Sequence, residues 1–280
     1  MAGLGTQVRG MLASTHPAPA AVVTLFAGVL AFAVLPSVGR ALLVTAAVGA
    51  GQLSIGWSND WLDADRDRRV GRTDKPAVRG VVAPEQLRTA ALLAVVGCAV
   101  LSFAAGWVAG ALHLVAVASG WAYNLGLKST VWSWVPYAVT FGLLPAFVVA
   151  GGGDGRVVAG WAVAAAALLG VGAHVANVLP DLEDDDATGV RGMPHRLGRR
   201  AGSVVAPLLL ASGCVVTLAG PPGAPTVAAS VLTGAACLLA AAAGVVGVLR
   251  PRSRAPFGLS MAVAALCVVE VALAAGAVAV

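Results

Sequence analysis

Two stretches of the chain repeat one arrangement of acidic and amide side chains. The sets share a spacing of four residues between neighbours: Asn59, Asp63 and Asp67 in the first, Asn177, Asp181 and Asp185 in the second. On a helix, residues at i, i+4 and i+8 lie along one face, so each set would stack three oxygen-bearing side chains. Asp60 and Asp184 add a second carboxylate beside each set.

Carboxylates this close together repel one another and raise each other's pKa, so the arrangement predicts a positive charge among them. Mg²⁺ fits, because it binds through one or two carboxylates, several waters and substrate phosphates. A solvated acidic loop is the usual alternative for a run of charge, but it does not account for two copies in register, each led by Asn. The predicted metal-binding residues are Asn59, Asp60, Asp63, Asp67, Asn177, Asp181, Asp184 and Asp185.

Basic side chains follow the acidic ones. Arg72 and Lys75 come directly after the first set, and the stretch YNLGLKST at 123–130 contains an isolated lysine, Lys128. Lysine and arginine bind phosphoryl oxygens that a metal leaves free, so these three are candidates for contact with a diphosphate. For the arginines as a class, a role in membrane topology or in lipid head-group contact is the alternative.

The rest of the chain has the composition of an integral membrane protein. Of the 280 residues, 59% are hydrophobic and 11% charged, whereas soluble domains contain about 25% charged residues. Continuous apolar runs of about 20 residues indicate membrane-spanning helices, not alternating barrel strands. Nine runs are expected to span: 19–37, 39–57, 87–105, 107–125, 132–151, 158–180, 202–220, 225–249 and 256–279.

The distribution of charge predicts orientation and internal symmetry. Sixteen of the eighteen Lys and Arg residues lie on the side of the N-terminus and the acidic loops, 58–86 and 181–200. The positive-inside rule makes that side cytoplasmic, and nine spans then put the C-terminus outside the cell membrane. Four spans separate the acidic loops, which suggests two four-helix repeats plus one helix within a single domain, 1–280.

Four short motifs resemble those of a known family. NDWLDADRD and DLEDDD are similar to the two Asp-rich motifs of the UbiA superfamily of intramembrane prenyltransferases. VGRTDKP and YNLGLK look like two further segments of its 4-hydroxybenzoate polyprenyltransferases. The resemblance covers almost the whole chain, since the family has nine helices with both motifs in cytoplasmic loops. The two Asp-rich motifs at this separation are its most specific part.

The resemblance implies a Mg²⁺-dependent transfer of a prenyl group from a polyprenyl diphosphate to an aromatic or quinone-precursor acceptor, through an allylic carbocation. It implies catalytic roles for Asp63, Asp67, Asp181, Asp185 and Lys128. The diphosphate-binding residues it implies are Arg72, Lys75, Tyr123, Asn124 and Lys128. Lys75 stands before Pro76 where the hydroxybenzoate members usually have Arg, so the acceptor stays open.

Two other functions are compatible with parts of this pattern. A membrane terpene cyclase would use the same metal and donor, but its cation would close on its own chain. A divalent-cation or solute transporter would place acidic ligands near the bilayer midplane, whereas these lie at span ends beside phosphate-type cations. The transporter is therefore the less favoured of the two.

Other polar residues inside the apolar runs carry weaker signals. His174 precedes Asn177 by one turn and could contact the acceptor, although a packed helix histidine is the alternative. Glu270 is a functional candidate because it lies within a span. Four cysteines are scattered singly, which predicts buried apolar side chains rather than a metal site.

Overall fold

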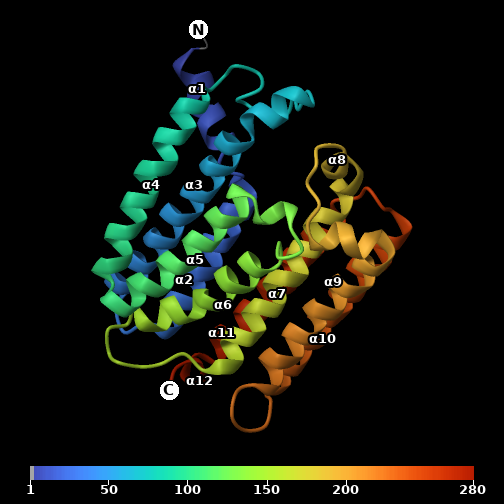
Figure 1. Ribbon diagram of the computed structural model, residues 1–280. Coiled ribbons are helices and arrows are strands. Elements are labelled where there is room, and N and C mark those ends of the chain that lie inside the picture. The colour runs from blue at the N-terminus through green and yellow to red at the C-terminus, as the bar shows by residue number, and fades with distance from the viewer. Residues whose placement is uncertain (1–2) are drawn as a thin grey trace.

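The computed structural model describes residues 3–280, and within them it is a bundle of helices without β-strands. Figure 1 shows the bundle from the side. The helices are α1 (Leu4–Ala13), α2 (Pro17–Val34), α3 (Val38–Arg69), α4 (Pro84–Ala104), α5 (Trp107–Leu125), α6 (Val135–Ala150), α7 (Gly160–Val178), α8 (Leu182–Ala187), α9 (Met193–Ala219), α10 (Val227–Leu249), α11 (Ala255–Leu273) and α12 (Ala275–Val278). Two 3₁₀ turns, η1 (Leu127–Ser129) and η2 (Leu179–Asp181), lie between them.

Eight segments of the described chain are long and apolar enough to cross a membrane. They contain α2, α3, α4, α5, α7, α9, α10 and α11. The run expected over 132–151 forms a shorter apolar helix, α6, with Pro145 inside it. The predicted all-α membrane bundle is confirmed, and the count of nine spans stays a prediction because α6 has only 16 residues.

Helix α3 extends well beyond its apolar part and carries the first Asp-rich set. Its 32 residues run without interruption to Arg69, where a turn begins that contains Gly71 at φ +70°. The sequence placed a loop from residue 58, and this was wrong for residues 58–69, which are helical. The absence of Gly and Pro from 57 to 70 permits the extension, and the i, i+3 ion pairs of Arg66 with Asp63 and of Arg68 with Asp65 support it.

The second Asp-rich set lies on a less regular segment. Helix α7 ends at Val178, the 3₁₀ turn η2 contains Pro180, and α8 begins at Leu182. Because a 3₁₀ turn has three residues per turn instead of 3.6, the angular relation between Asn177, Asp181 and Asp185 differs from that on one α-helix. The prediction of a single helical stripe was therefore wrong for this set.

The helices pack so that both Asp-rich segments meet at one end of the bundle. Helix α3 packs against α2, α4 and α5, while α7 packs against α6 and α9. Helix α11 closes the bundle by contacting α2, α7 and α9. In Figure 1 the N-terminus, α1 and α8 lie at one end and the C-terminus lies at the opposite end.

Isolated polar residues in the apolar runs have internal partners. The carboxylate of Glu270 is buried and accepts hydrogen bonds from Thr233, at 2.9 and 3.0 Å. Cys98, Cys214 and Cys267 are buried, as expected, and Cys237 is half-buried. The sequence did not predict that the sulfur atoms of Cys214 and Cys267 would lie 3.5 Å apart, because 53 residues separate them.

Close packing of α7 on α9 depends on one glycine from each helix. A Cβ atom at Gly172 would lie 2.9 Å from Cγ of Leu210, and a Cβ atom at Gly213 would lie 2.8 Å from Cγ of Leu169. Small residues at such a contact let two helix backbones approach closely within a membrane. This contact fixes the helix that leads into the second Asp-rich segment.

We expect Gly213→Val to lower the free energy of unfolding by about 1–3 kcal/mol, because the added atoms overpack the contact with Leu169. Gly234→Val is the matched control, since a Cβ atom at Gly234 meets nothing within 4 Å. The control should stay within about 0.5 kcal/mol of the wild type. Unfolding in detergent measures both, and equal effects would contradict this account of the packing.

Candidate active site

The acidic residues of the first set are buried at the end of α3. Asp60, Asp63 and Asp67 are 2%, 7% and 3% exposed, whereas the side chain of Asp65 between them is 85% exposed. An ionised carboxylate that leaves water is strongly destabilised unless a charge or several hydrogen bonds compensate. Each buried carboxylate therefore needs a cationic partner.

Lysine side chains supply two of these partners. The Lys128 ammonium, on η1, donates to both carboxylate oxygens of Asp63, at 2.5 and 2.6 Å. Burial lowers the pKa of Lys128 below its ordinary value, and the Asp63 carboxylate opposes this shift. Lys75 donates to Oδ1 of Asp60 at 2.6 Å. Two lysines predicted to bind diphosphate thus contact predicted metal ligands.

Arginine side chains compensate other acids of the two sets. Arg66, one turn after Asp63, donates to that carboxylate at 2.9 Å and lies 3.4 Å from Oδ1 of Asp67. Arg254, on the loop before α11, donates to Asp181 at 3.1 and 3.3 Å. Neither arginine was identified from the sequence.

Arg72 connects the two Asp-rich segments electrostatically. Its guanidinium donates two hydrogen bonds to Asp74, at 3.0 Å each, which raise the pKa of Arg72 above its ordinary value. Asp67 and Asp181 shift this pKa in the same direction. The guanidinium of Arg72 therefore lies within electrostatic range of one carboxylate from each set.

The remaining acids of these segments point outward. Asp65, Glu183 and Asp186 have side chains that are 85%, 58% and 48% exposed. They form ion pairs with Arg68, Arg199 and Arg191, respectively. Asp65 lies between the i, i+4 positions of the first set on α3, so its side chain leaves the helix on another face. Asp184, a predicted ligand, is exposed as well, while Asn177 and Asp185 are half-buried.

The chemistry of the carboxylate set fits a hard divalent cation, although basic groups lie among the acids. Within residues 3–280, no three carboxylate, imidazole or thiol groups converge closely enough to hold a metal ion. The Asp63 carboxylate instead binds the ammonium of Lys128, and the Asp60 carboxylate binds that of Lys75. These ammonium groups mark positions at which the protein stabilises positive charge, and the surrounding ligands are oxygens, which Mg²⁺ prefers.

The side chain of Asn124 forms hydrogen bonds to α3 and so helps to position that helix. Its side-chain amide donates to the carbonyl oxygen of Ile55 and to the hydroxyl of Ser58, at 2.9 and 2.8 Å. Its side-chain oxygen accepts from Asn59 at 3.2 Å. The amide of Asn124 therefore orients the predicted metal ligand Asn59, and contact with diphosphate stays a prediction.

Aromatic side chains and His174 lie deeper in the bundle, beside the acids. The imidazole of His174 is stacked on Tyr137, with ring centroids 4.2 Å apart, and meets the edge of Tyr123 at 5.7 Å. Tyr123 lies within electrostatic range of Asp63 and Asp185, one from each set. The predicted acceptor-side histidine is thus next to the space between the two sets.

The imidazole of His174 pairs with the Ser133 hydroxyl. Ser133 accepts a hydrogen bond from the backbone N–H of Met193 at 2.8 Å and lies 3.2 Å from Nε2 of His174. Because a hydroxyl can donate or accept, this pair is compatible with both tautomers of His174. Nδ1 is buried and has no hydrogen-bond partner among the described residues.

A second histidine beside the acids was missed by sequence reasoning. Nδ1 of His195 accepts from the backbone N–H of Gly192 at 3.1 Å, so Nε2 carries the proton. That Nε2 lies 3.6 Å from Oδ2 of Asp185. The N-terminus of α9 therefore brings His195 to the second set.

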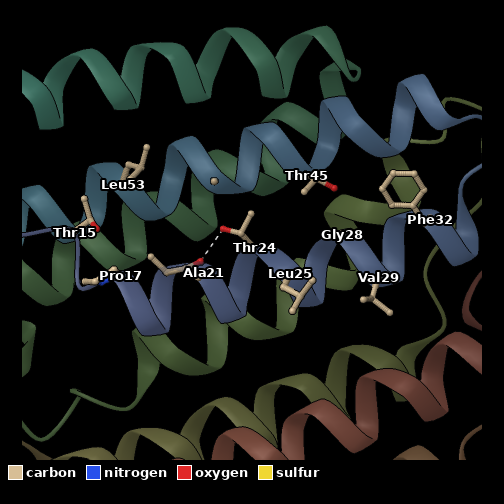
Figure 2. Close-up of a pocket in the computed structure, with 12 residues that line it drawn as sticks. Thr15, Pro17, Ala21, Thr24, Leu25, Gly28, Val29, Phe32, Thr45 and Leu53 are labelled. Carbon is tan, nitrogen blue, oxygen red and sulfur yellow. Dashed lines mark hydrogen bonds between the residues drawn. The ribbon is translucent and has the colours of Figure 1, made fainter. Parts of the chain in front are cut away.

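An apolar groove lies apart from this cluster. It has a volume of about 880 Å³ between α2 and α3, and Figure 2 shows Thr15 and Phe32 toward its opposite ends. Exposed Leu25, Val29 and Phe32 line it, as expected for a surface that faces lipid chains. It contains none of the predicted site residues, and we assign no catalytic role to it.

Comparison with known families identifies the chain. It belongs to the UbiA prenyltransferase family, whose model matches residues 20–262. This match includes both Asp-rich sets and confirms the resemblance seen in the sequence. A search of curated proteins gave no match.

Solved structures share the fold at low sequence identity. A UbiA homologue from Archaeoglobus fulgidus bound to GPP and Mg²⁺ superposes with a TM-score of 0.73 at 16% identity, covering 95% of this chain and 99% of that one. The apo structure of a UbiA homologue from Aeropyrum pernix K1 gives 0.72 at 21% identity, covering 91% and 97%. A digeranylgeranylglyceryl phosphate synthase gives 0.66 at 16%, covering 97% and 99%.

We expect Asp63→Asn to destabilise the protein, because it leaves the Lys128 ammonium buried without its partner. Removal of one member of a buried ion pair costs about 3 kcal/mol or more. Asp65→Asn is the matched control on the same helix, since its exposed pair with Arg68 contributes at most about 1 kcal/mol. Chemical unfolding in detergent compares them, and equal stabilities would show that the buried Lys128 ammonium does not need the Asp63 carboxylate.

Proposed function

We propose that this protein transfers a prenyl group from a prenyl diphosphate to a small aromatic or quinone-precursor acceptor, in a Mg²⁺-dependent reaction. The observation that carries the proposal is the buried pair of Lys128 and Asp63, which puts a phosphate-type cation among candidate metal ligands. Membership of the UbiA family supports it. So does the structurally similar Archaeoglobus fulgidus homologue, which binds GPP and Mg²⁺.

The diphosphate of the donor would bind at the end of the bundle where the two Asp-rich sets face each other. Mg²⁺, held by the carboxylates of both sets, would neutralise the leaving diphosphate when bound. Lys75, Lys128 and Arg72 would then turn from carboxylates to phosphoryl oxygens. Each is within reach because it already contacts an acid of this region.

The reaction would break the allylic C–O bond of the donor and form a bond between its C1 and a carbon of the acceptor ring. The diphosphate leaves with the electron pair of the C–O bond, and the ring loses one proton. Aromatic walls would exclude water from the allylic cation. Tyr123 lies within electrostatic range of one acid from each set, and its contact with diphosphate is part of the proposal.

His174 would bind the acceptor. Its Nδ1 is buried without a hydrogen-bond partner, which is costly unless a ligand supplies one. In the tautomer with the proton on Nδ1, this nitrogen is a donor. An oxygen of an acceptor ring can accept this hydrogen bond, whereas a prenyl chain has no acceptor atom. This donor favours a transferase over the terpene cyclase, which would need no second substrate.

Purified protein supplied with Mg²⁺, geranyl diphosphate and a panel of hydroxylated aromatic acids should yield a prenylated ring, and EDTA should stop the reaction. Lys128→Ala should lower the transfer rate about a hundredfold, because one donor to the leaving group is lost. Lys128→Arg should recover part of it. Arg191→Ala is the control, since Arg191 pairs with Asp186 on the surface.

Two results would contradict the proposal. One is a cyclic hydrocarbon as the product in the presence of acceptors, which would establish a cyclase. The other is transfer that persists unchanged: persistence with EDTA would remove the metal from the site, and persistence in Lys128→Ala would remove the lysine.

We further propose that the Asp-rich end faces the cytoplasm of a cell whose plasma membrane holds the protein. Cysteines at positions 65 and 186 should then resist a membrane-impermeant maleimide in intact cells and react after permeabilisation. A cysteine at position 154 is the control, because Asp154 lies at the opposite end and should react in intact cells. The reverse labelling pattern would invert the orientation.

A further inference from the structure

The segment that precedes α2 is built closely onto the Asp-rich end of α3. The indole N–H of Trp57 donates to the carbonyl oxygen of Met11 at 2.9 Å. Gly56 allows the backbone of Thr15 to cross directly over α3, since a Cβ atom at Gly56 would lie 2.4 Å from that carbonyl oxygen. These two contacts fix the backbone on both sides of the turn that leads to His16.

His16 has an uncommon backbone conformation. Its φ of 52° and ψ of 64° lie in the left-handed region, and within residues 3–280 it is the only non-glycine residue with positive φ. Histidine is tolerated there better than most residues, but glycine would adopt it without steric cost. A strained conformation that neighbouring contacts maintain is a frequent mark of a functional position.

The conformation directs the imidazole of His16 to the first Asp-rich set. Nε2 lies 3.1 Å from Oδ1 of Asp60 and 3.3 Å from Nζ of Lys75, which itself donates to Oδ1 of Asp60. One imidazole nitrogen cannot satisfy both neighbours. With a proton it donates to Asp60, and without one it accepts from Lys75.

We propose that His16 is a positioning residue that holds the Asp60 carboxylate when Lys75 leaves it. The inference rests on the proposed function, in which Lys75 turns to the diphosphate. His16 would then take the tautomer with Nε2–H and donate to Asp60, so that the carboxylate stays oriented toward the divalent cation. Loss of a residue that orients a metal ligand in this way typically lowers metal affinity 10- to 100-fold.

His16 was not identified from the sequence, and the residues that match the family model do not include it. The family model begins at residue 20, four positions after His16, and 44 residues separate His16 from Asp60. The His16 side chain is 42% exposed, so its imidazole can exchange a proton with water when the tautomer changes. The positioning role is therefore inferred from the structure of the N-terminal segment alone.

The test uses full-length protein in detergent, without prenyl donor, and measures Mn²⁺ binding by the electron paramagnetic resonance signal of free Mn²⁺. The bound cation should displace the Lys75 ammonium from Asp60, which leaves His16 as the partner of this carboxylate. His16→Gly should therefore weaken binding about tenfold or more. Its melting temperature should be unchanged or higher, because glycine relieves the left-handed strain and Lys75 still pairs with Asp60. His16→Asn, which tolerates this conformation and keeps an amide donor, should recover part of the affinity.

Ala13→Gly is the matched control, a glycine placed at an exposed position of the same segment. Wild-type Mn²⁺ affinity in His16→Gly would overturn the inference. So would a weaker affinity that Ala13→Gly shares together with a lower melting temperature, because both changes would then report a loosened segment.

Failure of the proposed function is a separate outcome. It would appear as a wild type that transfers no prenyl group from geranyl diphosphate, whatever its Mn²⁺ affinity. If transfer occurs, His16→Gly should raise the KM for geranyl diphosphate at subsaturating Mg²⁺ and approach wild-type kcat when Mg²⁺ saturates. A kcat defect that saturating Mg²⁺ does not reduce would overturn the positioning role.

Discussion

Burial of carboxylate charge at the end of α3 is the constraint on which the site depends. Three aspartates of one helical face are less than a tenth exposed, and isolated charges in such surroundings are strongly disfavoured. Lys128 meets this requirement from η1, Lys75 from the loop after α3, and Arg66 from α3 itself. The loops that surround the site are therefore held by the charges they neutralise.

The same pairing suits the chemistry proposed for the site. An ammonium bound to a carboxylate in a ligand-free protein is close to the position from which it can bind a phosphoryl oxygen. Burial lowers the pKa of Lys128, and the Asp63 carboxylate opposes this shift by favouring the ammonium form. A diphosphate, which is also an anion, can replace the carboxylate in this role while divalent cations compensate the acids.

Spacing alone predicted the features that depend on one helix. The first Asp-rich set, the outward direction of Asp65 and the membrane-spanning runs all follow from helical periodicity. The second set departs from prediction because Pro180 lies in a 3₁₀ turn, a local change that acidic spacing does not reveal. Arg254 contacts Asp181 across 73 residues, and no pattern along the chain connects two residues that only the packing of α11 on α7 brings together.

The histidines show why local partners, and not residue type, determine what a side chain can do. The backbone N–H of Gly192 can only donate, so it fixes Nδ1 of His195 as an acceptor and leaves Nε2–H toward Asp185. The Ser133 hydroxyl beside His174 can donate or accept, so it is compatible with both tautomers of that imidazole. No backbone group of the described residues bonds the His16 ring, so its tautomer can follow Lys75 and Asp60. Of these three imidazoles, His16 is therefore the one suited to respond when the charges around Asp60 change.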